Sequence, residues 1–160
     1  MNQIHVLFVC LGNICRSPMA EGIFKSIVAK NGLSNHFVIN SARTSNYHID
    51  KNPDPRTIST CKKRGISIDH KGKQLFSTHL FEQDYIIAMD AGNLKNIESL
   101  YASKLHTAKV FLMRDFDPLF KGQDVPDPYY GGIDGFSEVF DMLMRSSYEL
   151  LQYIRSEHSI

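Results

Sequence analysis

A cysteine and an arginine stand six residues apart near the start of the chain, in the string Cys10-Leu-Gly-Asn-Ile-Cys-Arg16. The string follows an apolar run and precedes a Ser-Pro pair, which is typical of the first turn of a helix. Gly12 and Asn13 tolerate left-handed backbone conformations, so several N–H groups of the loop can turn inward. The helix dipole adds positive potential, and the planar guanidinium of Arg16 can bind two oxygens at once. The loop is therefore suited to bind an oxyanion such as phosphate.

The same positive surroundings act on the sulfur of Cys10. The loop amides, the helix dipole and Arg16 all favour the thiolate, which is the nucleophilic form of cysteine. Attack of this thiolate on phosphorus would form a phosphocysteine, and Ser17 is placed to stabilise the sulfur when that intermediate is cleaved. The competing interpretation is a packed thiol at a strand end before an ordinary helix, and it leaves the combination of Gly12, Asn13, Arg16 and Ser17 unexplained.

Transfer of a phosphoryl group from an ester also needs a proton for the leaving group and a base for water. One carboxyl group can serve both steps in turn. Asp127 is the candidate, because its loop follows the last predicted strand and Pro126 and Pro128 stiffen it. From the residues alone a simple turn aspartate is an equal alternative, and three other aspartates compete for the role: Asp115, Asp117 and Asp124.

Alternating strand and helix patterns must position these side chains. Short apolar segments predict four strands, at residues 4–9, 37–41, 85–89 and 109–113. Amphipathic stripes predict four helices, at about residues 17–31, 55–64, 90–101 and 136–154. Ser17 is expected to cap the first helix and Asp90 the third. The pattern predicts a single α/β domain over residues 1–160, a four-stranded open parallel sheet with helices on both faces and a central first strand. The carboxyl ends of the strands then converge on one edge.

Composition narrows the class of protein further. The chain has 160 residues, of which 42% are hydrophobic and 22% charged, and this suits one ordinary globular core. A formal net charge of +1 disfavours a nucleic-acid partner. No apolar run is long enough to span a membrane, so no membrane partner is expected. Three sparse cysteines and no recognisable secretory signal predict a reducing, cytoplasmic location.

These motifs together resemble the low-molecular-weight protein tyrosine phosphatases, whose signature Cys-x5-Arg-Ser is present as residues 10–17. The resemblance covers essentially the whole chain and includes Ser41-Ala-x-Thr44, Met89-Asp90 and Asp127-Pro-Tyr-Tyr130. It implies hydrolysis of phosphotyrosine and aryl phosphates through a phosphocysteine on Cys10, with Asp127 as general acid and base. It also implies tyrosine-phosphorylated proteins as partners, inorganic phosphate as product and competitive ligand, and no metal or organic cofactor.

The resemblance further implies which residues form the substrate slot. Tyr129 and its neighbour Tyr130 match the aromatic pair beside the acid, and Tyr47 matches a variable aromatic position on the opposite wall. Leu11 and Ile14 would contribute an apolar floor, so a phenyl ring could be held between them.

Other matching positions imply support and redox roles. Asn13, Ser41 and His70 match a hydrogen-bond network that holds the loop asparagine in a strained conformation. Cys15 matches a thiol that forms a reversible disulfide with the nucleophile and shields it from over-oxidation. On their own, His70 is compatible with an ordinary surface histidine and Cys15 with a small buried residue. Asp90 is assigned a structural role as a helix cap.

The chain departs from the family at Arg43, where the family has a small residue. This arginine is expected to place an extra cation near the mouth of the slot. We therefore predict a preference for acidic phosphopeptides.

Four alternative functions remain to be weighed. An arsenate reductase needs further downstream cysteines, and only Cys61 follows. A phosphocysteine carrier lacks a paired Arg16 and a general acid, and a phosphotyrosine-binding module would need neither Cys10 nor Asp127. A protein-arginine phosphatase is closer, but such proteins tend to have threonine in place of Ile14 and to lack the tyrosine pair.

Overall fold

The computed structural model describes residues 2–45, 52–70, 72–76, 79–101, 107–131 and 133–160. Its four strands are β1 (Ile4–Cys10), β2 (Phe37–Arg43), β3 (Tyr85–Ala88) and β4 (Lys109–Leu112). All four predicted strands are confirmed. The second runs two residues further than predicted, and the third and fourth each end one residue earlier.

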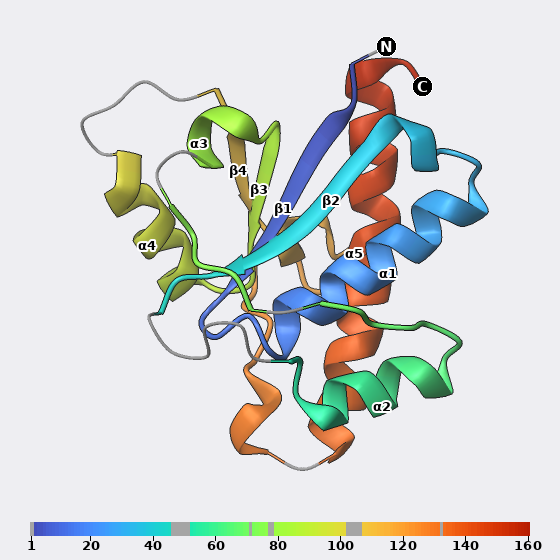
Figure 1. Ribbon diagram of the computed structural model, residues 1–160, viewed down its shortest axis with the longest axis vertical. Helices are drawn as coiled ribbons and strands as arrows, with labels where there is room; N and C mark the ends of the chain where they lie inside the picture. The colour runs from blue at the N-terminus through green and yellow to red at the C-terminus, as the bar shows by residue number, and fades with distance from the viewer. Residues whose placement is uncertain (1, 46–51, 71, 77–78, 102–106, 132) are drawn as a thin grey trace.

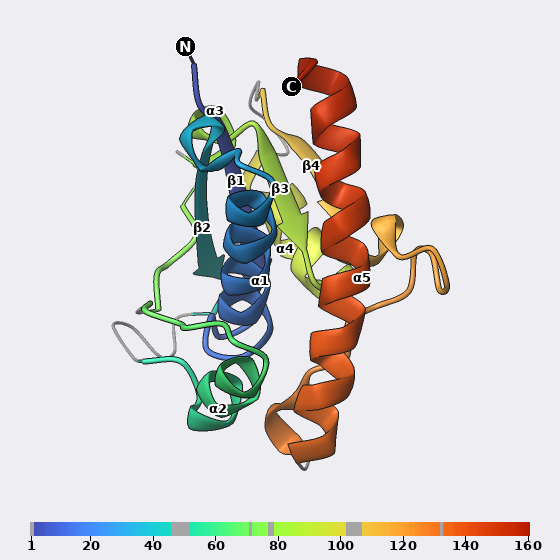
Figure 2. The ribbon, with the colours of Figure 1, turned by 90° about the vertical axis from the view of Figure 1, so that its right-hand side faces the viewer.

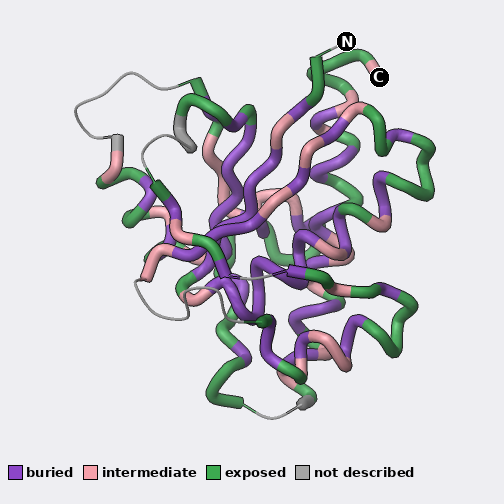
Figure 3. Tube along the Cα trace, viewed as in Figure 1, coloured by how far each residue is buried: buried purple, intermediate pink, exposed green. Residues whose placement is uncertain are grey.

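The strands form one parallel sheet in the order β2-β1-β3-β4. The first strand is central, as predicted, and its Val6 pairs with Ile39 of β2 on one side and Tyr85 of β3 on the other. Because β1 has a neighbouring strand on each side and helices on both faces of the sheet, almost every residue of β1 is apolar and buried. Figure 3 shows the buried strands running through the middle of the molecule.

The helices are α1 (Arg16–Lys30), α2 (Pro55–Lys63), α3 (His79–Glu82), α4 (Ala91–Tyr101) and α5 (Ile133–His158), with short 3-10 turns η1 (Ser34–His36), η2 (Met113–Phe116) and η3 (Pro128–Tyr130). The helices α1 and α5 lie side by side on one face of the sheet, and α4 lies on the other face (Figures 1 and 2). The predicted α/β class with helices on both faces is confirmed.

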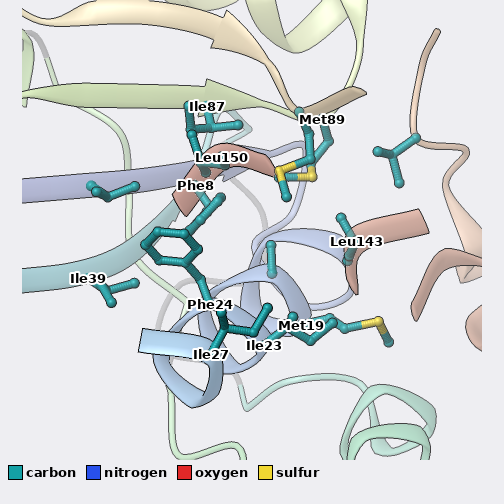
Figure 4. Packing of buried hydrophobic residues seen from close by; sticks show 14 of the residues in the cluster. Phe8, Met19, Ile23, Phe24, Ile27, Ile39, Ile87, Met89, Leu143 and Leu150 are labelled. Carbon is teal, nitrogen blue, oxygen red and sulfur yellow. The ribbon is translucent and has the colours of Figure 1, made fainter. Parts of the chain in front are cut away.

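The larger core lies between the sheet and the layer of α1 and α5. Phe24 of α1 meets Phe8 of β1 edge to face at a centroid distance of 5.6 Å and Phe37 of β2 at 5.7 Å. Leu143 and Leu150 of α5 close the cluster (Figure 4). This packing fixes the start of α1 against the end of β1, where the cysteine loop lies.

The first helix starts differently from the prediction. It begins at Arg16, with Cys15 at the N-cap position and no side-chain capping bond, so the prediction that Ser17 caps it is wrong. The hydroxyl of Ser17 is instead used inside the loop, where it contacts Cys10 and Asn13. Among the described helices, none is both long and apolar enough to cross a membrane.

Candidate active site

The carboxyl edge of the sheet brings distant segments to one cavity. Its lining comes from the loop after β1, the start of the segment after β2 and the loop before α5, and comprises Cys10, Leu11, Gly12, Ile14, Cys15, Arg16, Ser45, Asp127, Tyr129 and Tyr130. Nine of these ten were predicted from the sequence, and Ser45 was not. Its position directly after the Ser41-Ala-x-Thr44 segment was the available signal.

The sulfur of Cys10 is surrounded by polar groups of the loop. It accepts the backbone N–H of Asn13 at 3.3 Å and that of Ser17 at 3.5 Å. The Ser17 hydroxyl lies 3.0 Å from the same sulfur. The two N–H groups stabilise negative charge on the buried sulfur, and the Ser17 hydroxyl is close enough to donate to it when it is a thiolate.

Asn13 adopts the left-handed conformation that the loop requires, with φ of 56°. Its side-chain amide donates to the hydroxyls of Ser17 at 2.7 Å and Ser41 at 3.0 Å. Its carbonyl oxygen accepts from Nε2 of His70 at 2.7 Å and from the backbone of Lys73 at 2.9 Å. Four bonds therefore hold the strained residue in place, and the structure brings together all three residues of the network expected from the resemblance.

Glu21 of α1, which was not a candidate from the sequence, anchors this network. Its carboxylate accepts from the Ser41 hydroxyl at 2.7 Å and lies 3.3 Å from Nδ1 of His70. Burial opposes its ionisation, but bonds from His70, Lys25 and Ser41 lower the pKa of Glu21 from 4.5 to about 2. The available signal was an acidic residue among the apolar residues of the first predicted helix.

Arg16 is buried and held by two acceptors on its Nη1. These are the carboxylate of Asp90 at 2.7 Å and the backbone carbonyl of Val125 at 2.8 Å. Its other terminal nitrogen lies 3.7 Å from Asp127 Oδ2. Burial by itself lowers the pKa of Arg16, but neighbouring Cys10 and Asp90 offset it, so the pKa lies above its ordinary value. The guanidinium is therefore a permanent cation in a fixed orientation.

Asp90 has more than the structural role assigned to it from the sequence. One oxygen accepts the backbone N–H of Asn93 at 2.7 Å, so it does cap α4 as predicted. The other oxygen forms the ion pair with Arg16. Asp90 therefore orients the cation of the cavity as well as starting a helix.

Of the four competing aspartates, only Asp127 lines the cavity. Its Oδ1 accepts the backbone N–H of Tyr129 at 3.0 Å, which starts the short turn η3. The other three bind elsewhere: Asp115 to the backbone of Leu112, Asp117 to Arg114 and Arg145, and Asp124 to the backbone of Ala91.

The walls of the cavity are apolar and exposed. Leu11, Tyr129 and Tyr130 are exposed by 45%, 38% and 87%, so an aromatic ring could enter between them. Tyr47, the expected opposite wall, lies outside the described residues. The expectation that Arg43 presents a cation at the mouth is wrong, because this side chain is 1% exposed and its Nε donates to the backbone carbonyl of Ser45.

The three cysteines are free thiols and all are buried. Burial, with the neighbouring Asp54 and Cys10, raises the pKa of Cys15, so this thiol in the cavity stays protonated. Burial raises the pKa of Cys61 to about 12. In the described part of the chain, no cluster of three or more histidine, cysteine or acidic side chains is arranged to hold a metal ion.

Comparison with known proteins gives consistent matches. The family model described as low molecular weight phosphotyrosine protein phosphatase matches residues 5–159. A Saccharomyces cerevisiae protein described by the same words is 44% identical over 153 residues, covering 94% of each chain. A crystal structure of a protein tyrosine phosphatase from Entamoeba histolytica matches with a TM-score of 0.90 and 36% identity, over 98% of this chain and 99% of that one. A structure described as drosophila arginine phosphatase matches with a TM-score of 0.87 and 31% identity, over 94% and 97%.

Proposed function

The chain belongs to the family of low molecular weight phosphotyrosine protein phosphatases, and from this premise we propose that it hydrolyses protein phosphotyrosine through a phosphocysteine on Cys10. The observation that carries the proposal is the position of the Cys10 sulfur. It accepts two backbone N–H groups and contacts the Ser17 hydroxyl in a cavity that also contains Arg16 and Asp127.

In the first step, the Cys10 thiolate attacks phosphorus and the bond from phosphorus to the tyrosine oxygen breaks. The backbone amides of the loop and the guanidinium of Arg16 bind the remaining phosphate oxygens, where charge develops. Asp127 gives its proton to the departing phenolate. Ile14 and Leu11 contact the ring from one side and Tyr129 from the other.

In the second step, the Asp127 carboxylate takes a proton from water, and the water oxygen attacks the phosphorus of phosphocysteine. The bond from sulfur to phosphorus breaks and returns the thiolate to Cys10, where the Ser17 hydroxyl stabilises it. Inorganic phosphate leaves as the product, and we expect it to compete with substrate for the same loop. None of these steps uses a metal or organic cofactor.

A protein-arginine phosphatase is the second candidate, because a structure described in those words shares the fold at 31% identity. Ile14 and the exposed Tyr129 and Tyr130 favour phosphotyrosine, since all three offer apolar surface to an aromatic ring.

We also propose that peroxide oxidation joins Cys10 and Cys15 in a reversible disulfide. A cytoplasmic location, inferred from cysteine usage, completes the proposal.

The decisive test is phosphate release from a phosphotyrosine peptide at mildly acid pH with a chelator present. We expect turnover by the unaltered protein and a loss of about 10³-fold or more in Cys10→Ser. Cys61→Ser is the matched control, because Cys61 is buried in α2 away from the cavity, and it should keep turning over. Turnover that persists in Cys10→Ser, or that needs the chelated metal, contradicts the proposal. Faster release from a phosphoarginine peptide would favour the second candidate.

A further inference from the structure

Arg56, in the first turn of α2, joins two loops of the cavity although it was not a candidate from the sequence. Its guanidinium donates to two backbone carbonyls of the segment that carries Asp127, from Nη2 to Tyr129 at 2.9 Å and from Nη1 to Gly131 at 3.0 Å. The same guanidinium binds both carboxylate oxygens of Asp54, from Nε at 3.1 Å and from Nη2 at 3.0 Å.

Asp54 connects this arginine to the phosphate loop. Its backbone N–H donates to the carbonyl of Ile14 at 2.8 Å, inside the loop that surrounds the Cys10 sulfur. Its carboxylate also accepts the backbone N–H of Arg56 at 2.8 Å and so caps α2. Asp54 is buried, so its position is fixed by these bonds.

Two aromatic rings fix the plane of the guanidinium. The central carbon of Arg56 lies 4.6 Å from the ring centroid of Phe136 on α5 and 5.7 Å from that of Tyr129. A planar cation between ring faces and four hydrogen-bond acceptors has one orientation, which lysine could not reproduce.

The acid segment is attached to the sheet at its beginning. Val125 donates its N–H to the carbonyl of Met89 at 2.8 Å and accepts from Arg16, which fixes the segment next to the sheet. Asp127 itself lies 3.7 Å from Arg16. The three-residue turn η3 follows and packs against α5, and Arg56 binds its second residue and the glycine after it. Figure 1 shows α2 and this segment at the same end of the molecule as the loop after β1.

We propose that Arg56, held by Asp54, is a positioning residue that sets the distance between the Asp127 carboxyl and the phosphate held over Cys10. This inference rests on the proposed function, because it concerns proton donation by Asp127 to the leaving group. Arg56 touches neither the leaving group nor the sulfur; it acts through the backbone of residues 129–131. A displacement of the acid by about 1 Å is enough to lower a rate substantially.

The test measures kcat/KM over a series of aryl phosphates, from strongly activated nitrophenyl esters to esters of phenols as basic as tyrosine, with a pKa of about 10. Activated leaving groups need little proton donation, whereas basic ones depend on it. We expect Arg56→Ala to lower kcat/KM about tenfold for basic leaving groups and less than about twofold for activated ones. Arg56→Lys keeps the positive charge and most of the aliphatic chain. It should also lower kcat/KM more for basic than for activated leaving groups, but by a smaller factor than Arg56→Ala.

Arg64 provides a matched control at the same contact between α2 and α5. At the other end of α2 it packs over Phe140 of α5 at 4.7 Å and pairs with Asp141 at 3.1 Å, so Arg64→Ala removes a comparable contact between α2 and α5. We expect it to leave the dependence on leaving group unchanged. Urea unfolding of each variant confirms that the folded protein is being compared.

Asp127→Asn distinguishes failure of this inference from failure of the proposed function. If Asp127→Asn itself leaves the dependence on leaving group unchanged, the assigned acid and this inference are both wrong. If Asp127→Asn steepens the dependence but Arg56→Ala lowers all substrates equally or matches Arg64→Ala, only the role of Arg56 is wrong. In the double variant Asp127→Asn/Arg56→Ala, loss of Arg56 should add less than about twofold, because the group it positions is already absent.

Discussion

Asn13 shows how one residue can store backbone strain at a reaction centre. Its left-handed φ of 56° turns its own N–H toward the Cys10 sulfur. Its side chain meanwhile reaches back to Ser17, Ser41 and His70. A strained conformation persists only when the surroundings over-determine it, and the buried network that ends at Glu21 provides this.

This arrangement predicts a difference in stability between two small substitutions. Asn13→Gly and Asn13→Ala both remove the side-chain bonds, but only glycine adopts a positive φ without a steric penalty. We expect Asn13→Ala to be less stable than Asn13→Gly by about 1 kcal/mol in urea unfolding. Equal stability of the two variants, or greater stability of the alanine variant, would contradict the strain assigned to this position.

At the scale of elements, a buried carboxylate joins the end of the sheet to the last helix. Asp117, just after η2, is 1% exposed and accepts from Arg114 at 3.0 Å and from Arg145 of α5 at 3.1 Å. Burial opposes its ionisation, but bonds from Arg145, the Leu119 backbone and Arg114 lower its pKa from 3.8 to about 2. The segment leading to the acid is therefore attached to α5 by charge as well as by packing.

The depressed pKa of Asp117 fixes the sign of a pH effect on stability. Its contribution is fully present above pH 4 and is lost as the pH falls toward 2, because the folded state then binds the proton less readily than the unfolded state. We expect Asp117→Asn to be less stable than the unaltered protein by about 2 kcal/mol at neutral pH, and this difference to shrink as the pH falls below about 4.

Urea unfolding at several pH values measures that difference. Asp141→Asn is the control, because Asp141 is half exposed and pairs with Arg64 at the surface, where such pairs contribute little. A stability difference for Asp117→Asn that stays constant from neutral to acid pH would show that the carboxylate has no depressed pKa.

At the scale of the whole molecule, one sheet separates two cores. The larger one contains Leu150 of α5, and the smaller one contains Ile97 of α4, each completely buried. Alternate residues of β1 point into the two cores, so Phe8 belongs to the first and Val9 to the second. The central strand therefore couples the stability of both faces and of the edge that carries the cysteine loop.

We therefore expect the two cores to unfold together. Leu150→Ala and Ile97→Ala should each lower the free energy of unfolding by about 3 kcal/mol, and each should keep a single transition. Near-ultraviolet circular dichroism of the seven tyrosines and far-ultraviolet circular dichroism should give coincident curves. Two separate transitions in either variant would mean that the faces are independent.

The strands, the longer helices and most of the cavity lining could be predicted from the amino-acid sequence. Periodicity reveals strands and helices because burial selects apolar residues at fixed intervals, and this is a local property. The cysteine loop was recognisable for a similar reason, since Cys10, Gly12, Asn13 and Arg16 lie close together in the sequence. The rule for parallel sheets then predicted that Asp127 lies near Cys10 although they are far apart in sequence.

The partners of the charged side chains, in contrast, depend on the fold and could not be predicted from sequence patterns. Charge alone did not distinguish Asp127 from Asp117, and no sequence pattern placed Glu21 behind the loop or buried Arg43. Hydrogen bonds and ion pairs depend on separations of a few ångströms between distant segments, and hydrophobic periodicity carries no such information. For the same reason Ser17 was assigned to a helix cap, whereas in the fold its hydroxyl lies 3.0 Å from the Cys10 sulfur.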